Sequence, residues 1–430
     1  MPRLLLLLPT TTYRAEAFLE AAQRLNLDVT IGSERGPASA EQQSSAVLAL
    51  DFGHVENSVR KAVDFSQHHP IDTVIGVDDH TAVLAAHISA ALSLPHNSVA
   101  SVSAASNKHR MRTLLRQQEV PVPHFTVFPI DGNPETLGGQ VAYPCVVKPL
   151  ILSASCGVIR ANDGQEFVGA FRRVMALLMG LGLAGREEGG RQILVEDFVP
   201  GKEVALEGLL TDGQLRVLAL FDKPDPLDGP FFEETIYVTP SRLPTRIQQD
   251  IVACAAKAAN ALGLREGPMH GELRVNDRGV WVIEVAARSI GGRCSQTLRF
   301  AADLSLEELL LRHALRMDIP SFERERHAAG VMMLPIPYGG ILREVRGQAE
   351  ARAVQGIEEL TITAQPGQEL VPLPEGTRYL GFLLARGDSP EAVETSLREA
   401  HRRLDVVVSA VPTGGLGHPA QAAKPRAVTF

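Results

Sequence analysis

Short apolar runs and amphipathic segments alternate along the first hundred residues. The apolar runs are continuous, which is typical of strands buried on both faces of a parallel sheet. The segments between them repeat apolar residues with a helical period. The expected strands are residues 3–8, 28–31, 46–50 and 71–77, and the expected helices are 14–25, 55–66 and 81–92. This order predicts a doubly wound, parallel α/β domain over residues 1–105.

Closely spaced prolines at positions 121 and 123 end a basic helix, 107–118, and mark the border of a second region. Another change of pattern at about residue 329 marks a third. We expect a central domain over 106–328, a C-terminal α+β subdomain over 329–411 and a disordered tail over 412–430. Beyond residue 120 the expected strands are 143–148, 192–198, 204–210, 215–221, 270–275, 280–285, 330–335, 359–364, 380–385 and 405–409, and the expected helices are 165–183, 244–262 and 390–403.

Composition narrows the classes of function. The formal net charge is −8 and the basic residues form no large cluster, so a nucleic-acid partner is not expected. The apolar run at residues 4–8 is too short for a signal peptide, and no stretch approaches the length of a membrane span. The cysteines lack metal-ligand spacing and indicate a reducing compartment. We expect a cytoplasmic protein that binds neither nucleic acid nor membrane.

The strongest chemical signal is a predicted β-hairpin that brings two glutamates together. If residues 277–279 form a three-residue loop, Glu272 lies directly opposite Glu284. Opposed carboxylates repel each other, and a shared Mg²⁺ ion removes the repulsion. A solvated surface hairpin with two incidental glutamates is the alternative. The opposite face of the hairpin is predicted to join the core; its residues are Leu273, Val275, Trp281, Ile283 and Val285.

The residues after Glu284 carry a family resemblance. Val-Ala-Ala-Arg-Ser-Ile-Gly-Gly at 285–292 resembles the Glu-[Ile/Val]-Asn-Pro-Arg-x-x-Gly-Gly signature of the ATP-grasp ligases. Four more segments that resemble family motifs occur in the family's order, at 106–108, 144–149, 153–158 and 196–203. The resemblance covers nearly the whole chain. One departure is Ala286, which stands where the family commonly has an Asn that binds the metal.

The resemblance implies an enzyme that uses ATP and Mg²⁺, with Mn²⁺ as a substitute, and a mobile lid at about residues 125–205 of its ATP-grasp domain. It implies that Glu272 and Glu284 bind the metal and take part in catalysis. Arg288 is implied to face the transferred phosphoryl group, where a fixed guanidinium stabilises developing charge. The residues implied to bind ATP are Lys108, Lys148, Ser155, Gly157, Glu196, Phe198, Val199 and Glu203.

Three local features are similar to the L-amino-acid ligases, a subgroup of that superfamily. They are the segment 231–235, the Arg288-x-x-Gly291 element and the segment 330–340. The resemblance implies that the chain is a homodimeric ligase that joins a carboxylate, from an amino acid, to an amine. The route is an acyl phosphate, with release of ADP and phosphate. Glu234 is implied to bind a substrate ammonium; the other implied substrate-binding residues are Tyr237, Arg288, Gly291 and Gly292.

Two other classes of protein share parts of this pattern. A carboxylase similar to biotin carboxylase or to the purine-pathway carboxylase would use the same fold with bicarbonate. A catalytically weak regulatory protein would bind ATP without turnover. Phosphate release that depends on an amine separates the ligase from both.

Overall fold

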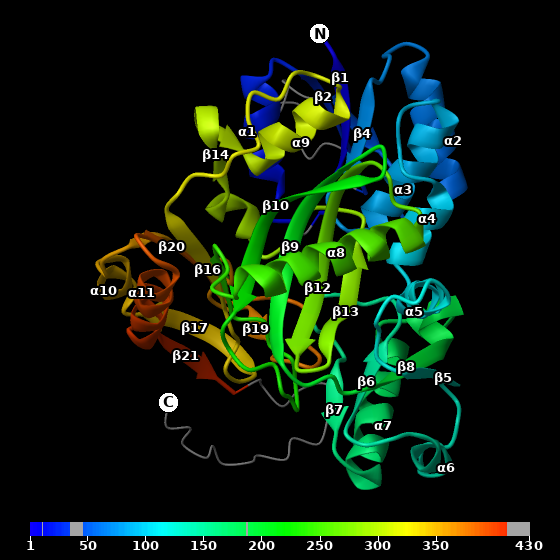
Figure 1. Cartoon of the computed structure of the whole chain (residues 1–430), viewed down its shortest axis with the longest axis vertical. Coiled ribbons are helices and arrows are strands. Elements are labelled where there is room, and N and C mark those ends of the chain that lie inside the picture. Colours follow the sequence, from blue (N-terminus) through cyan, green and yellow to red (C-terminus); the bar gives the residue numbers. More distant parts are fainter. Residues whose placement is uncertain (11, 35–45, 186–187, 411–430) are drawn as a thin grey trace.

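The computed structural model describes residues 1–10, 12–34, 46–185 and 188–410. Figure 1 shows an N-terminal α/β layer, a central sheet crossed by helix α8, a smaller sheet with helix α7 on one side, and a C-terminal unit on the other. The tail predicted at 412–430 lies outside the described residues. Within the described ranges, no helix combines the length and the apolar composition that a membrane crossing requires.

The N-terminal region forms the predicted parallel α/β domain. Its four strands pair in the order β3-β2-β1-β4, and every pair is parallel. Strand β1 is covered on both faces, because Leu4 packs with Phe18 while Leu5 packs with Leu84 in a separate core. This burial explains the continuous apolar run in the sequence. The elements are β1 (Arg3–Leu7), α1 (Ala15–Arg24), β2 (Asp28–Ser33), β3 (Ala46–Ala49), α2 (Val55–Ser66), β4 (Thr73–Gly76), α3 (Asp79–Ala91) and α4 (Val99–Ala105).

A second, antiparallel sheet occupies the region predicted as the lid. Its strand order is β5-β8-β6-β7. Helix α7 covers one face, where Phe167 and Phe171 pack against Val147 and Val195. The mobility of this unit stays a prediction. The elements are α5 (Lys108–Gln117), β5 (Phe125–Pro129), α6 (Pro134–Leu137), β6 (Cys145–Pro149), β7 (Ile159–Ala161), α7 (Gly164–Gly180) and β8 (Gln192–Asp197).

The central sheet has eight strands in the order β13-β12-β9-β10-β11-β16-β20-β18. Helix α8 crosses the face of β9, β12 and β13 (Figure 1), and its residue Ile251 packs in one core with Leu206 and Val282. The sheet continues through strands of the C-terminal region, so the two regions share one backbone hydrogen-bond network. The elements before residue 290 are β9 (Lys202–Thr211), β10 (Gln214–Lys223), β11 (Ile236–Thr239), α8 (Thr245–Leu262), β12 (Gly267–Asn276) and β13 (Gly279–Ala286).

The C-terminal region adds a second small sheet, with the order β19-β17-β21. Helix α9 was not predicted; it packs its Leu309 into the core that contains Phe18 of α1. The domain borders proposed from the sequence stay predictions. The elements are β14 (Arg299–Phe300), β15 (Leu304–Ser305), α9 (Leu306–Ala314), β16 (Ala328–Leu334), β17 (Gly340–Arg346), α10 (Gln348–Arg352), β18 (Ile357–Ile362), β19 (Glu369–Leu370), β20 (Gly381–Gly387), α11 (Pro390–Arg402) and β21 (Asp405–Ser409).

The β12–β13 hairpin places Glu272 opposite Glu284, as predicted, but by a different path. Asn276 pairs with Gly279, so the turn has one residue fewer than expected, and an irregularity between Glu272 and Leu273 restores the register. Strand β13 has one more residue than β12 at this irregularity, so the side chains between the turn and the irregularity point to the opposite face from the one predicted. The prediction for the core face was therefore wrong at positions 281 and 283. Trp281 and Ile283 lie outside the core; Val280 and Val282 replace them beside Leu273 and Val285.

Candidate functional site

One large cavity, of about 750 Å³, lies where the N-terminal domain, the lid region, the central sheet and a C-terminal loop meet. Every residue predicted for the site lines this cavity except Gly157. The Gly157 amide instead donates to the carbonyl of Pro374 at 2.7 Å. A Cβ atom at Gly157 would lie 3.0 Å from Leu177. Gly157 therefore packs within the lid just outside the cavity lining, and its contact with phosphate stays a prediction.

Two lysines approach the cavity from the lid side. Lys148, on β6, is 5% exposed and forms an ion pair with Glu196. Lys108, at the start of α5, donates to the carbonyl of Leu152 at 2.7 Å and lies 3.5 Å from a carboxylate oxygen of Glu284. Both ammonium groups are thus held at the edge of the cavity by neighbouring oxygens. Compact cations in such positions suit phosphate oxygens.

Glu196, expected beside the adenine, lines the cavity but is only 4% exposed and pairs with two cations. Fully buried Arg112 donates from Nε to the carboxylate at 2.5 Å, and Lys148 pairs with the other oxygen. Burial opposes the charge of Glu196, but Arg112 and Lys148 outweigh it and lower its pKa. Arg112 was not predicted. The sequence indicated only that Arg112 belongs to a basic helix.

The segment expected to meet the adenine edge retains unused backbone groups. The amide of Phe198 donates to the carbonyl of Pro144 at 3.0 Å, and the carbonyl of Val199 accepts from Arg274 at 2.7 Å. The Phe198 carbonyl and the Val199 amide have no hydrogen-bond partner among the residues that the structure describes. One acceptor and one donor next to each other match the edge of a nucleobase.

A buried lysine that the sequence analysis missed organises the acidic side of the site. Nζ of Lys223, at the end of β10, lies 2.8 Å from Glu203, 2.7 Å from Glu234 and 3.1 Å from Glu272. Burial disfavours the charged form of Lys223, but these carboxylates raise the pKa of its ammonium well above the usual value. The sequence could have indicated Lys223 through the β9–β10 hairpin, because the pair farthest from its turn places Lys223 opposite Glu203.

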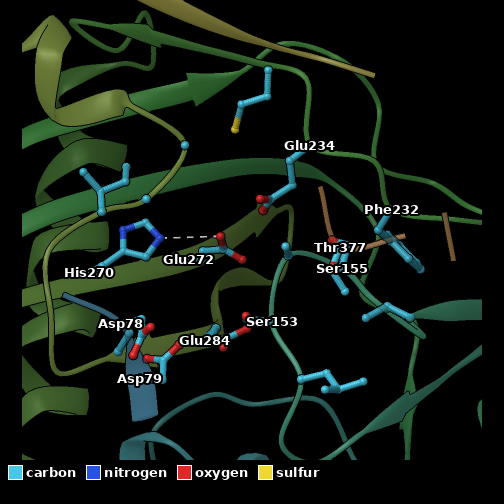
Figure 2. A pocket seen from close by; sticks show the side chains of 18 of the residues that line it. Asp78, Asp79, Ser153, Ser155, Phe232, Glu234, His270, Glu272, Glu284 and Thr377 are labelled. Atoms are coloured by element: carbon cyan, nitrogen blue, oxygen red, sulfur yellow. Dashed lines mark ion pairs between the residues drawn. The ribbon is translucent and has the colours of Figure 1, made fainter. Parts of the chain in front are cut away.

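Two of the carboxylates around Lys223, those of Glu203 and Glu234, differ in their proton affinity. Burial opposes the charge of Glu203, but Lys223 and Arg274 outweigh it and lower the pKa of Glu203. Glu203, expected to bind ribose, thus has a cation on each oxygen, with Arg274 at 2.7 Å. Burial and the nearby Glu272 raise the pKa of Glu234 to about 7, although Lys223 acts against them. Figure 2 shows the carboxylates of Glu234 and Glu272 directed toward each other in the pocket.

Glu272 and Glu284 form a pair of donors that fits a divalent cation. They are directly opposed across β12 and β13, both line the cavity, and their side chains are 15% and 27% exposed. Carboxylate oxygens are the ligands that Mg²⁺ prefers. A second acidic group among the described residues, Glu203, Glu234 and Glu272, has oxygens within 4.8 Å of one another. The Lys223 ammonium lies among these carboxylates and contributes one positive charge to the group.

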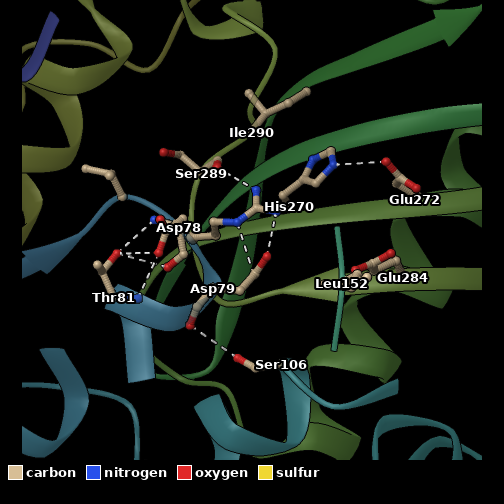
Figure 3. A network of polar contacts seen from close by, with 12 residues as sticks. Asp78, Asp79, Thr81, Ser106, Leu152, His270, Glu272, Glu284, Ser289 and Ile290 are labelled. Atoms are coloured by element: carbon tan, nitrogen blue, oxygen red, sulfur yellow. Dashed lines mark hydrogen bonds and ion pairs between the residues drawn. The ribbon is translucent and has the colours of Figure 1, made fainter. Parts of the chain in front are cut away.

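Arg288 links the central sheet to the N-terminal domain. Its guanidinium donates to both oxygens of Asp79, at 3.1 and 3.0 Å. Burial disfavours the charge of Arg288, but Asp79 more than compensates and raises the pKa of the guanidinium. Asp79 is the first residue of α3 and lines the cavity, and Figure 3 shows the contact of its backbone with Ser106. The arrangement fixes the orientation of one cation next to the opposed carboxylates.

Another part of the cavity wall is formed by Tyr13, the glycine pair at 291–292 and Met333, which are closely packed. The amide of Gly292 donates to the hydroxyl of Tyr13 at 2.6 Å, and a Cβ at Gly292 would lie 2.3 Å from the sulfur of Met333. Gly292 also has a φ of 61°, so only glycine fits there without strain. Gly291 and the buried Tyr237 line the same cavity. Of the two glycines predicted from the sequence, Gly292 thus lies where a side chain does not fit without strain, while a Cβ at Gly291 would lie 3.3 Å from the hydroxyl of Tyr13.

Comparison with known proteins finds two family matches. The ATP-grasp domain family matches residues 141–297, and the L-amino acid ligase C-terminal domain 2 family matches residues 332–409. The chain is similar to a crystal structure of L-amino acid ligase from Bacillus licheniformis, with a TM-score of 0.82 and 26% identity, covering 95% of this chain and 99% of that one.

Two curated relatives align over shorter stretches. Alanine–anticapsin ligase of Bacillus subtilis is 27% identical over 40% of this chain and 39% of its own length. Carnosine synthase 1 of Gallus gallus is 31% identical over 51% of this chain and 24% of its own length. The chain therefore spans well under half of the length of either relative.

Proposed function

The chain belongs to the ATP-grasp superfamily and carries an L-amino acid ligase C-terminal domain, and on this premise we propose that it joins two amino acids. It is an ATP-dependent, ADP-forming carboxylate–amine ligase. The donor amino acid supplies the carboxylate and the acceptor supplies the amine. The observation that carries the proposal is the single cavity lined by Lys108, Lys148, Arg288 and the opposed pair Glu272 and Glu284.

The proposed reaction has two steps. A carboxylate oxygen of the donor attacks the γ-phosphorus of ATP, an O–P bond forms, and ADP leaves. The amine of the acceptor then attacks the carbonyl carbon, a C–N bond forms, the C–O bond to phosphate breaks, and the amine releases a proton. Lys108 and Lys148 neutralise the phosphates, and the fixed guanidinium of Arg288 stabilises charge on the transferred group. The backbone at Phe198 and Val199 would bind the adenine.

The remaining assignments follow from the same cavity. Glu272 and Glu284 would hold Mg²⁺, which when bound neutralises charge on the ATP phosphates. Water would take the ligand position that Ala286 leaves open. Glu234 would accept the ammonium of the donor, next to Tyr237. A homodimer and a cytoplasmic location stay predictions.

The proposal predicts a pH dependence that comes from Glu234. Its pKa is about 7, so the carboxylate is mostly protonated at pH 6 and mostly ionised at pH 8. Only the ionised form attracts an ammonium, so kcat/KM for the donor should rise about tenfold from pH 6 to pH 8. Initial rates measured across this range in wild type and Glu234→Gln check the prediction. The variant should lack the rise; an equal rise in both would assign it to another group.

The test of the proposed function is phosphate release from Mg-ATP with the twenty L-amino acids, supplied singly and in pairs. Release that requires a pair, with an equal amount of dipeptide detected by mass spectrometry, supports the ligase. Release driven by bicarbonate would replace the ligase with a carboxylase. ATP binding without release in any mixture would identify a regulatory ATP-binding protein.

A further inference from the structure

A loop of the C-terminal region, residues 371–380, reaches into the cavity and is fastened to the lid region. The carbonyl of Pro374 accepts from Gly157, and the carboxylate of Glu375 forms a bidentate ion pair with Arg173 of α7. Thr377 of this loop and Ser155 of the lid both line the cavity, and Figure 2 labels both. The residues that follow Glu375 are thus held at a defined place in the cavity wall.

This loop carries a cation that differs from the others around the cavity. The cationic Lys and Arg side chains that line the cavity are Arg14, Lys108, Lys148, Arg274, Arg288 and Arg378. Five of them have hydrogen-bond or ion-pair partners, among them carbonyls for Arg14, Glu203 for Arg274 and Asp79 for Arg288. Within the described part of the chain, only Arg378 has none, and it is exposed. Arg378 is therefore free to bind an anion that enters the cavity.

The proposed reaction brings two carboxylates into the cavity but consumes only one. The donor carboxylate becomes the new amide, so it must lie beside the phosphates, near Lys108 and Arg288. If the acceptor is an amino acid, its carboxylate remains intact. Glu234, Glu272 and Glu284 would repel that charge at short range. A free guanidinium resolves the conflict, since its planar fork binds a carboxylate through two parallel hydrogen bonds.

The position of Arg378 suits this task. It also lines a small side pocket with Glu234, Ile336 and Tyr379. The acceptor carboxylate would thus lie on the C-terminal side of the cavity, while the lysines that face the phosphates lie on the lid side.

We propose that Arg378 binds the carboxylate of the acceptor amino acid and so selects acceptors that carry a free carboxylate. The inference rests on the proposed ligase function and adds the residue that recognises the second substrate. Amines without a carboxylate, and C-terminal amides of amino acids, are then poor acceptors.

The test compares each of the twenty L-amino acids with its C-terminal amide as acceptor, at a saturating concentration of the donor found in the pair screen. The variants are Arg378→Ala and Arg378→Glu. The matched control is Arg343→Ala, an exposed arginine of β17 that donates to Ser409 outside the cavity. The readouts are kcat and KM for the acceptor, and KM for ATP.

In Arg378→Ala, KM for the amino acid should rise about 10- to 100-fold, as expected for losing a charge-assisted hydrogen-bonded pair. The ratio of kcat/KM for amino acid over amide should fall by the same factor. Arg378→Glu should make the amide the better acceptor, and the control should keep the wild-type ratio. An unchanged ratio in both variants would overturn the inference, and so would a rise confined to KM for ATP, which would assign Arg378 to phosphate. Wild-type protein without any pair-dependent release would overturn the proposed function itself.

Discussion

Replacement of Glu284 by alanine is expected to lower kcat for phosphate release about 100- to 1,000-fold, the scale of losing a preorganised group that stabilises charge. The substitution removes one of two directly opposed carboxylates that line the cavity. It also leaves the Lys108 ammonium without the carboxylate that now lies 3.5 Å away. The measurement is pair-dependent phosphate release at increasing Mg²⁺ concentration. The variant should need far more Mg²⁺ for any residual rate.

The control for Glu284 is Glu344→Ala, an exposed glutamate of β17 that pairs with Arg346. It should release phosphate at the wild-type rate. Wild-type kinetics and Mg²⁺ dependence in Glu284→Ala would contradict the metal assignment. Circular dichroism should give the same spectrum for both variants, because the side chain of Glu284 is 27% exposed and its removal opens no cavity in the core.

Replacement of Lys223 by methionine is expected to lower the free energy of unfolding by about 3–5 kcal/mol at pH 8, as for other buried charges that lose their partner. The ammonium lies between Glu203, Glu234 and Glu272. Without it, the ionised carboxylates face one another in a buried site. Methionine keeps most of the side-chain volume, so packing changes little. Urea denaturation followed by circular dichroism gives the free energy.

The loss in Lys223→Met should depend on pH. The pKa of Glu234 is already raised to about 7, and removing the cation raises it further. A raised pKa in the folded state means that the protonated carboxyl is favoured there, so stability is retained near pH 5 and lost as pH rises through 7. The double variant Lys223→Met/Glu272→Gln should recover part of the loss at pH 8. An equal loss at pH 5 and pH 8 would show that packing, and not charge, is responsible.

Much of the fold could be predicted because the pattern was local. The apolar run of β1 and the helical periods around it were sufficient for the N-terminal domain. The face of the sheet on which Trp281 and Ile283 lie was not predictable. It depends on a register irregularity next to Glu272, and no residue type in the hairpin indicates that irregularity. Helix α9 was overlooked although its sequence is amphipathic.

The family motifs were sufficient to select residues that lie around one cavity, although the roles of these residues stay predictions. Residues that reach the cavity through long-range contacts were not found. Lys223 could have been found by extending the β9–β10 hairpin to its end, opposite Glu203. Arg112 reaches Glu196 from a helix more than eighty positions earlier in the chain. Arg378 lies in a loop without periodicity, which long-range contacts of Pro374 with Gly157 and of Glu375 with Arg173 hold at the cavity.

The central claim is that the donor carboxylate is activated as an acyl phosphate. The most direct measurement uses a donor amino acid labelled with ¹⁸O in both carboxylate oxygens, in a full reaction with Mg-ATP and acceptor, followed by mass spectrometry of the released phosphate. The account predicts one ¹⁸O atom in each phosphate. The oxygen that bridges carbon and phosphorus in the acyl phosphate comes from the donor carboxylate, and it leaves with the phosphate when the amine attacks the carbonyl carbon. Phosphate without ¹⁸O, or label recovered in AMP, would contradict it.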